Sequence, residues 1–356
     1  MPEGRLQITE KIVNCLILEG YENMAMKKFI NDPLNLTPEL LAGMEIAHGD
    51  KIAIQSEKMV VRAAPKDQSK VALLTLGGAG HEPALSGFVG DGLLDVSVVG
   101  DIFAAPGPPK VLEAMRLLKR DAGILFVVLN HAGDVMSANM AMEMAEKEGI
   151  KIKMVLTHED IAPGINTPIE DRRGLVGCVP LYKIAGAAAE AGKSLDEVYE
   201  IAERFNNNMA TLAVAMNSAT HPSTGDVLFD LADDEMEIGM GQHGEAGTGS
   251  TKILTADKTA EVMGGALISA VKAGQGDKVM VILNGAGATT LMELFIVLGG
   301  VKKLLDEKGI VIAASHVGEL LTVQEMAGFQ MFIAKMDDEL IKLWNAPADS
   351  PYMTVR

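Results

Sequence analysis

The chain is poor in cysteine. Its 356 residues include only Cys15 and Cys178, which have neither a CxxC spacing nor the spacing of metal ligands. A disulfide framework and a cysteine zinc site are therefore not expected, and a reducing compartment, the cytoplasm, is favoured. Basic charge is also scarce, since 48 acidic residues against 31 basic ones give a net charge of −17. Nucleic acid and anionic membrane surfaces repel such a chain, so we expect neither as a partner.

Long apolar runs are missing as well. The run at residues 12–18 is too short to span a membrane and lacks a convincing signal-peptide core, so we expect no export. There is no repeat of fixed period and no low-complexity tract. What is present is 48% hydrophobic and 22% charged residues, which is typical of a soluble globular protein, and the length is enough for two domains or one large one.

Strand and helix signals alternate through the first half of the chain. Four short apolar runs bounded by Gly, Asp or Asn predict strands at residues 71–76, 93–99, 124–129 and 150–156. Helical periodicity fills residues 108–119 and 136–147 between them. This alternation indicates an α/β fold with a mostly parallel sheet, covered by helices on both faces.

The second half begins with alanine-rich helices predicted at residues 182–191 and 195–205, and a domain boundary near residue 190 is plausible. The elements expected after them are strands at residues 211–216, 236–238, 278–283, 310–314 and 329–335, and helices at residues 255–272, 289–308 and 337–344. The polar interval at residues 218–234 predicts a long functional loop.

Four glycine-containing turns follow predicted strands, at residues 77–83 (GGAGHEP), 130–134 (NHAGD), 239–245 (GMGQHGE) and 284–289 (NGAGAT). Ligands bind beyond the carboxyl ends of strands in open α/β sheets, so these turns are predicted to converge on one pocket. A neutral imidazole of His81 or His243 can attack a carbonyl group or transfer protons, and Asp134 can accept a proton from a hydroxyl. The set suits a small hydroxy-carbonyl compound. Taken singly, each histidine could be structural and Asp134 could be a helix cap.

Two nucleotide-binding patterns are incomplete. Gly239, Gly241 and Gly244 have the GxGxxG spacing, but residues 245–250 prolong the loop where a dinucleotide fingerprint requires a helix. No GxxxxGK[ST] sequence occurs, and residues 285–289 lack the lysine of a phosphate loop. A nucleotide is therefore expected to lie elsewhere.

Over nearly its whole length the chain resembles the substrate-binding K subunit of dihydroxyacetone kinase. The matching segments follow the family's order, at residues 29–33, 77–83, 100–104, 130–134, 172–174, 183–190, 234–245 and 287–289. The resemblance implies two α/β domains and a homodimer. Residues 1–190 and 322–356 would form the first domain, and residues 191–321 would form a second, smaller α/β sandwich that carries the His243 loop.

The resemblance also implies a mechanism. His243 matches the histidine that adds to the C2 carbonyl of dihydroxyacetone and holds it as a covalent hemiaminal, while His81 and Asp134 match the acid/base groups that contact the hydroxyls. Capture of this kind requires a ketone, so glycerol is rejected by chemistry. No metal site is implied. The substrate-binding positions are Gly78, Ala79, Gly80, His81, Asp134 and His243.

Members of this family place nucleotide and magnesium on a helical L domain, which is fused in ATP-dependent enzymes and separate in phosphotransferase-dependent systems, where an M subunit rephosphorylates ADP. The resemblance therefore implies no cofactor in this chain, ADP or ATP with Mg²⁺ on an L-type partner, and an M-type subunit in the second case. Because the chain ends at Arg356, we expect a free-standing subunit.

Some neighbours of the functional positions differ from the family pattern. Leu76 and Ala79 replace a glycine and a serine in the family's GGGSGHEPA turn, while His131 and His221 occur where the family reads NYTGD and CTVP. The substrate could be dihydroxyacetone or a related short ketose such as erythrulose. Two functions stay open: a subunit of a ketose kinase, and a non-catalytic coactivator or sensor that reports ketose level to a regulator.

Overall fold

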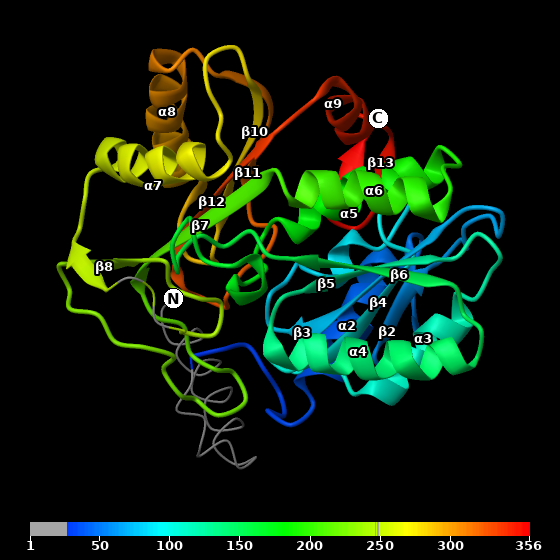
Figure 1. The fold of residues 1–356 in the computed structure, drawn as a ribbon. Helices are drawn as coiled ribbons and strands as arrows, with labels where there is room; N and C mark the ends of the chain where they lie inside the picture. Colours follow the sequence, from blue (N-terminus) through cyan, green and yellow to red (C-terminus); the bar gives the residue numbers. More distant parts are fainter. Residues whose placement is uncertain (1–26, 246, 248) are drawn as a thin grey trace, which may run out of the picture.

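The computed structural model describes residues 27–245, 247 and 249–356. The apolar run at residues 12–18 and Cys15 lie outside the described residues. Figure 1 shows two twisted sheets, one above the other, with helices outside and between them. Among the described residues, no helix is long and apolar enough to cross a membrane.

The first sheet has the strand order β1-β2-β4-β3-β5-β6. Its strands are Ile52–Gln55 (β1), Met59–Arg62 (β2), Ala72–Ala79 (β3), Val96–Ile102 (β4), Ile124–Leu129 (β5) and Ile152–Thr157 (β6). The pairs β3/β4, β3/β5 and β5/β6 are parallel, while β1 and β2 add antiparallel pairs at one edge. Every residue of β5 is buried, as a parallel strand covered on both faces requires. The predicted mostly parallel sheet is confirmed.

The second sheet has the strand order β11-β10-β12-β7-β8-β9. Its strands are Met209–Asn217 (β7), Glu235–Ile238 (β8), Ser250–Lys252 (β9), Lys278–Gly285 (β10), Val311–Gly318 (β11) and Ala327–Lys335 (β12). In this sheet β10 and β11 run parallel to each other, and the other four pairs of neighbouring strands are antiparallel. Both units are therefore of the α/β class, but neighbouring strands are mostly parallel in the first sheet and mostly antiparallel in the second.

Helices form three layers around the two sheets (Figure 1). The α-helices are Leu36–His48 (α2), Pro108–Leu117 (α3), Ala132–Lys147 (α4), Cys178–Glu190 (α5), Leu195–Asn206 (α6), Ala256–Ala270 (α7), Leu291–Glu307 (α8) and Asp338–Trp344 (α9). Short elements complete the chain: 3₁₀ turns at Ser86–Phe88 (η1) and Ile169–Asp171 (η2), and a hairpin of Ala348–Asp349 (β13) with Thr354–Val355 (β14). Apolar side chains of α3 and α4 cover the outer face of the first sheet, and those of α7 and α8 cover the outer face of the second.

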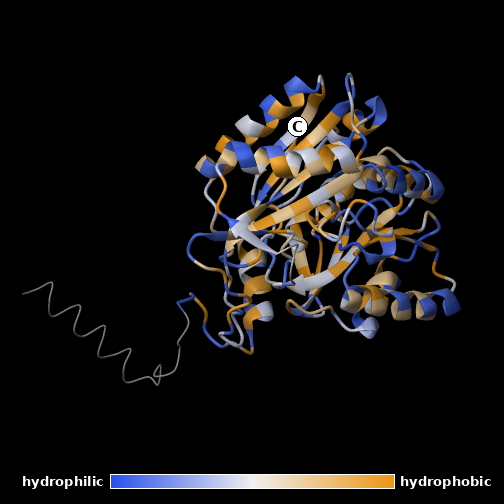
Figure 2. Ribbon diagram, turned by 60° about the vertical axis from the view of Figure 1, so that its left-hand side comes forward, coloured by the Kyte–Doolittle hydropathy of each residue, from blue (hydrophilic) through white to orange (hydrophobic). Residues whose placement is uncertain are grey.

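The middle layer, formed by α5 and α6, is shared by both sheets. One continuous core includes Leu125 of β5, Ile184 of α5, Phe205 of α6 and Phe332 of β12. Figure 2 agrees, since the strands are mostly orange while the outer helices alternate orange with blue. The two units are therefore joined by a common apolar interior, which fixes the turns at their facing ends relative to one another.

The structure assigns two segments differently from the predicted division. β12, which the prediction placed in the first domain with residues 322–356, pairs with β10 and β7 in the second sheet. α6, which the prediction placed in the second domain, buries Val198, Ala202 and Phe205 and contacts β5 and β6 of the first sheet. Strand pairing and helix docking are decided by partners far away in the sequence, which local periodicity does not reveal.

Gly186 lies where α5 meets the backbone of residues 92 and 93. A Cβ atom there would lie 2.4 Å from the carbonyl oxygen of Gly92 and 2.7 Å from the Cα of Leu93. We therefore expect Gly186→Ala to lower the free energy of unfolding by about 1–3 kcal/mol or more, measured by urea denaturation. Gly265→Ala in α7 is the matched control, because no atom lies within 4 Å of its Cβ position, and it should be neutral or stabilising by up to about 1 kcal/mol. Equal midpoints for the two variants would contradict this account.

Candidate active site

Turns from both units meet at one cavity of about 220 Å³, which is below the roughly 300–1,000 Å³ usual for drug-sized ligands. Its walls are the segments that follow β3, β4 and β5 in the first sheet and the loop that follows β8 in the second. A Cβ atom on Gly78 would lie 2.7 Å from the backbone nitrogen of Ala104, so glycine is needed where two of these segments approach. The cavity suits a ligand of a few carbon atoms.

Three of the four predicted turns line this cavity. They supply Gly78 and His81, then Asp134, and then His243. The expectation that the fourth turn, residues 284–289, would join them is wrong for this cavity. Instead, the Asn284 side chain accepts the backbone N–H groups of Leu320 and Leu321 at 2.7 and 3.0 Å, and so holds the segment that contributes Leu321 to the wall. Ala79 and Gly80, predicted as binding positions, are not among the lining residues.

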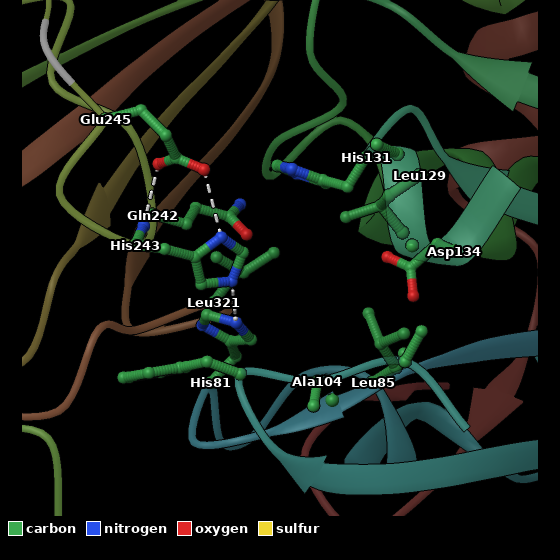
Figure 3. Close-up of a pocket in the computed structure, with 16 residues that line it drawn as sticks. His81, Leu85, Ala104, Leu129, His131, Asp134, Gln242, His243, Glu245 and Leu321 are labelled. Atoms are coloured by element: carbon green, nitrogen blue, oxygen red, sulfur yellow. Dashed lines mark hydrogen bonds and ion pairs between the residues drawn. The ribbon is translucent and has the colours of Figure 1, made fainter. Parts of the chain in front are cut away.

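His81 and His243 face each other through their Nε2 atoms at 3.1 Å (Figure 3). The Nδ1 of His81 lies 2.9 Å from the carbonyl oxygen of Thr322, and the Nδ1 of His243 lies 3.0 Å from Oε1 of Glu245. A carbonyl oxygen and a carboxylate only accept hydrogen bonds, so both Nδ1 atoms carry protons. Both Nε2 atoms would then present lone pairs, and a further proton is needed between them.

Burial weakens the affinity of His81 for this proton. Burial and the neighbouring His243 lower the pKa of His81 to about 3. Burial would raise the pKa of Glu245, but hydrogen bonds and charge from His243 outweigh it and hold that pKa well below its usual range. Glu245 is therefore a carboxylate beside His243, and His81 has a weakened affinity for a proton between the two Nε2 atoms. His81 is the acceptor of that proton.

Asp134 stands across the cavity from His243, in the first turn of α4 (Figure 3). Burial raises its pKa to about 7, against an opposing effect of His243. Its carboxyl group has no hydrogen-bond partner among the described residues, and it does not cap α4. The alternative of a helix cap is therefore not what the structure shows, and the free carboxyl faces the space where a ligand would lie.

Sequence reasoning missed two residues of this site. Glu245 orients His243 twice, because its second oxygen also accepts the backbone N–H of His243 at 2.9 Å. Phe103 packs against both histidines, with its ring centre 4.9 Å from that of His81 and 5.4 Å from that of His243. The available signals were the position of Glu245 two residues after His243 and the position of Phe103 four residues after the strand predicted at residues 93–99.

The four residues named above that differ from the family pattern lie in different parts of the structure. Leu76 is buried in the core under α3 and α4, and Ala79 is buried in the shared core, so neither lines the cavity. His131 does line it, and its Nε2 donates to the carbonyl of Gly174 at 2.9 Å. His221 packs its ring edge-on against Phe103 at 5.4 Å, outside the lining. Of these four residues, His131 is therefore the one that changes the cavity wall.

The segment at residues 172–174 braces the His243 loop. Arg173 pairs with Asp160 at 2.7 Å and donates to the carbonyl of Gly239 at 2.8 Å, while the Asn130 side chain donates to the carbonyl of Arg172 at 2.7 Å. These contacts tie the loop after β8 to the turn after β5. These contacts therefore fix the positions of the two cavity walls relative to each other.

The chain matches the Dak1 domain from residue 42 to residue 352. It is 37% identical over 326 residues to the PTS-dependent dihydroxyacetone kinase 1, dihydroxyacetone-binding subunit DhaK, of Listeria innocua, with 91% of this chain and 99% of that protein covered. It is 36% identical over 330 residues to the L-erythrulose kinase of Pectobacterium atrosepticum, with 92% of this chain but only 56% of that protein covered.

Two solved structures are similar in fold. The dihydroxyacetone kinase operon co-activator Dha-DhaQ superposes with a TM-score of 0.84 at 28% identity, covering 89% of this chain and 98% of that one. The dihydroxyacetone kinase from C. freundii, in complex with AMP-PNP and Mg²⁺, gives a TM-score of 0.82 at 27% identity and covers 93% of this chain but 61% of that one. The chain thus corresponds to the whole of the first protein and to part of the second.

Proposed function

Because this chain belongs to the Dak1 family of dihydroxyacetone kinases, we propose that it is the substrate-binding subunit of a kinase for dihydroxyacetone or a closely related short-chain ketose. The reaction is transfer of a phosphoryl group to an alcohol, and it requires a partner subunit. The observation that carries the proposal is the His81–His243 pair, held at 3.1 Å by Thr322 and Glu245 and facing Asp134 across a small cavity.

Covalent capture follows from the proton positions. His81 accepts the Nε2 proton of His243, which frees the lone pair of His243 to attack the C2 carbonyl carbon. As the nitrogen–carbon bond forms, the carbonyl electron pair moves to oxygen, and this oxygen takes the proton from His81. The product is a hemiaminal whose imidazolium keeps its Nδ1 proton against the Glu245 carboxylate. Charge is conserved, and no cofactor is needed for this step.

Phosphorylation then needs a base for the terminal hydroxyl of the captured ketose. Asp134 lies on the opposite wall with a free carboxyl group, so in its ionised form it accepts the hydroxyl proton as the oxygen attacks the phosphoryl group. Positioning and proton removal are what this side of a phosphoryl transfer supplies. Gly78 of the same cavity offers a backbone contact to the ligand.

The phosphoryl donor is proposed to lie on a second protein. This sequence has no phosphate-binding loop, and it covers only 61% of the C. freundii kinase that was solved with AMP-PNP and Mg²⁺. An L-type subunit that carries ADP or ATP with Mg²⁺ is therefore the expected partner, with an M-type phosphotransferase subunit where the donor is rephosphorylated ADP. We further propose a homodimer that works in the cytoplasm, in glycerol and ketose metabolism.

A second candidate function has a specific observation in its favour. The operon co-activator matches this chain over 98% of its own length with a TM-score of 0.84, so the fold by itself does not separate a kinase subunit from a regulator. In that case the same covalent capture would report ketose level to a transcription regulator. Erythrulose is a candidate ligand beside dihydroxyacetone, because an L-erythrulose kinase is 36% identical to this chain over the shared region.

Reconstitution with partner subunits distinguishes a kinase subunit from a ketose-reporting regulator. The purified chain is combined with an L-type subunit, Mg²⁺ and ATP, or with L-type and M-type subunits and their phosphoryl donor, and is offered dihydroxyacetone, erythrulose or glycerol. We expect ketose phosphate from a ketose and none from glycerol. A ketose adduct without turnover in every combination would instead support the regulator.

A further inference from the structure

His131 brings a third imidazole to the pair already described. One ring nitrogen of His131, one of His243 and one carboxylate oxygen of Glu245 lie within 4.8 Å of one another. In Figure 3 the ring of His131 points from the opposite wall toward His243 and Glu245. Two histidines and one glutamate form a ligand set that catalytic zinc sites use, with a fourth position left for water.

Each of these three side chains is already oriented through its other polar atom. The Nε2 of His131 donates to the carbonyl of Gly174 at 2.9 Å, which leaves its Nδ1 as a lone-pair donor. The second oxygen of Glu245 accepts the backbone N–H of His243, and the Nε2 of His243 meets His81. Hydrogen bonds of this kind from the far side of a ligand are what fix tautomer and ring orientation in metal sites.

The spacing is compatible with a small cation. His243 Nδ1 and Glu245 Oε1 are 3.0 Å apart, close to the roughly 3.3 Å that separates two ligands at about 2.0–2.1 Å from a tetrahedral Zn²⁺. His131 would have to approach by at most about 1.5 Å from the 4.8 Å limit. A cation would occupy the place of the proton between His243 and Glu245.

A cation at that place replaces the Nδ1 proton of His243. When Nδ1 binds a metal, the proton of the neutral imidazole lies on Nε2, where it can donate to the Nε2 of His81. His81 in turn donates from Nδ1 to Thr322, so every ring nitrogen has a complementary partner. His131, His243 and Glu245 all line the cavity of about 220 Å³, so a cation held between them occupies space that the ketose needs to reach His243.

We propose that His131, His243 and Glu245 form a binding site for a divalent transition-metal cation such as Zn²⁺, and that the bound cation blocks capture of the ketose. The cation site stands on the geometry of the three side chains alone. The block on capture rests on the proposed function, because it presupposes that His243 is the nucleophile. The site thus makes ketose binding sensitive to metal, through a residue that the family pattern does not contain at position 131.

The test uses the untagged full chain, stripped with a chelator and titrated with Zn²⁺ in a calorimeter, and with Co²⁺ for its absorption spectrum. We expect one ion per chain, and a tenfold or greater loss of affinity in His131→Phe and in Glu245→Gln. His221→Asn is the matched control, since His221 contacts Phe103 beside the pocket but lies outside the three-residue cluster, and it should bind Zn²⁺ as the parent does.

Capture is followed in parallel by carbon-13 NMR of dihydroxyacetone labelled at C2, with and without Zn²⁺. Zn²⁺ at 100 times its dissociation constant should weaken capture about 100-fold in the parent chain, and much less in His131→Phe, each compared with the same protein without metal.

Failure of the parent to bind Zn²⁺ up to about 100 μM, or equal binding by all variants, overturns the site. Binding that leaves capture unchanged overturns the block. Absence of capture in metal-free protein counts against the proposed function, while the titration still decides the site.

Discussion

His243→Ala should abolish covalent capture of the ketose and lower the rate of phosphorylation at least about 1,000-fold. The reason is that the Nε2 of His243 is the atom paired with a proton acceptor, the Nε2 of His81, at 3.1 Å. His81 has its Nδ1 bound to Thr322 and lies on the opposite side of the 3.1 Å contact, and Asp134 is across the cavity. Removal of the ring also opens space beside Phe103, so loss of the bond is not offset by a tighter fit.

Two measurements check this prediction. Intact mass under mild conditions, or the C2 carbon signal of labelled dihydroxyacetone, reports the adduct, and a coupled assay with the L-type partner reports phosphorylation. His48→Ala is a suitable control because its ring packs against Tyr352, away from the cavity, and it should behave as the parent does. Tight ketose binding that persists in His243→Ala would show that recognition does not depend on the covalent bond.

Asp134→Asn should impair phosphoryl transfer but leave covalent capture of the ketose intact. The amide has the same shape as the carboxyl group but cannot accept the hydroxyl proton, so phosphorylation should fall about 100- to 10,000-fold while the adduct still forms. Asp101→Asn is the matched control, since Asp101 lies near the carboxyl end of β4 in the first sheet but is exposed and paired with Lys58. Near-normal turnover in Asp134→Asn would remove its role as the base.

The pH profile provides an independent readout of the same residue. Burial raises the pKa of Asp134 to about 7, so the protonated, inactive form dominates below that pH. We expect phosphorylation by the parent chain to fall about tenfold per pH unit below 7 and to level off above it. In Asp134→Asn the residual rate should lose this step. A step that survives in the variant would assign the titration to another group.

Much of the architecture could be read from the sequence. The buried run of β5 and the alternating helices predicted a parallel sheet, because a strand covered on both faces must be apolar throughout. The glycine turns with His81 and Asp134 follow β3 and β5, which are parallel neighbours, so their carboxyl ends lie at one edge of the first sheet. His243 lines the same cavity, but it follows β8 of the second sheet, whose neighbours are antiparallel. Local pattern and strand direction were sufficient for the first two turns, and the packing of the two sheets brings the third to them.

Other features depended on contacts between distant segments. β12 joins the second sheet through hydrogen bonds to β7 and β10, and its own sequence is equally compatible with an additional strand of the first. The turn at residues 284–289 resembles the other glycine turns, yet its Asn284 braces the backbone of Leu320 and Leu321 and does not enter the cavity. A glycine turn after a strand predicts a possible ligand site, not which cavity it will reach.

By itself the sequence determined the class of fold, the family and three residues that line one cavity, His81, Asp134 and His243, because periodicity and motif identity are local properties of the chain. Only the tertiary structure decided the state of those residues. The Nε2 atoms of His81 and His243 meet because Thr322 and Glu245 hold their other nitrogens, and the pKa of Asp134 rises because its carboxyl group is buried. Proton positions and pKa values depend on what surrounds a group in space, and residues up to 241 positions apart in the chain supply those surroundings here.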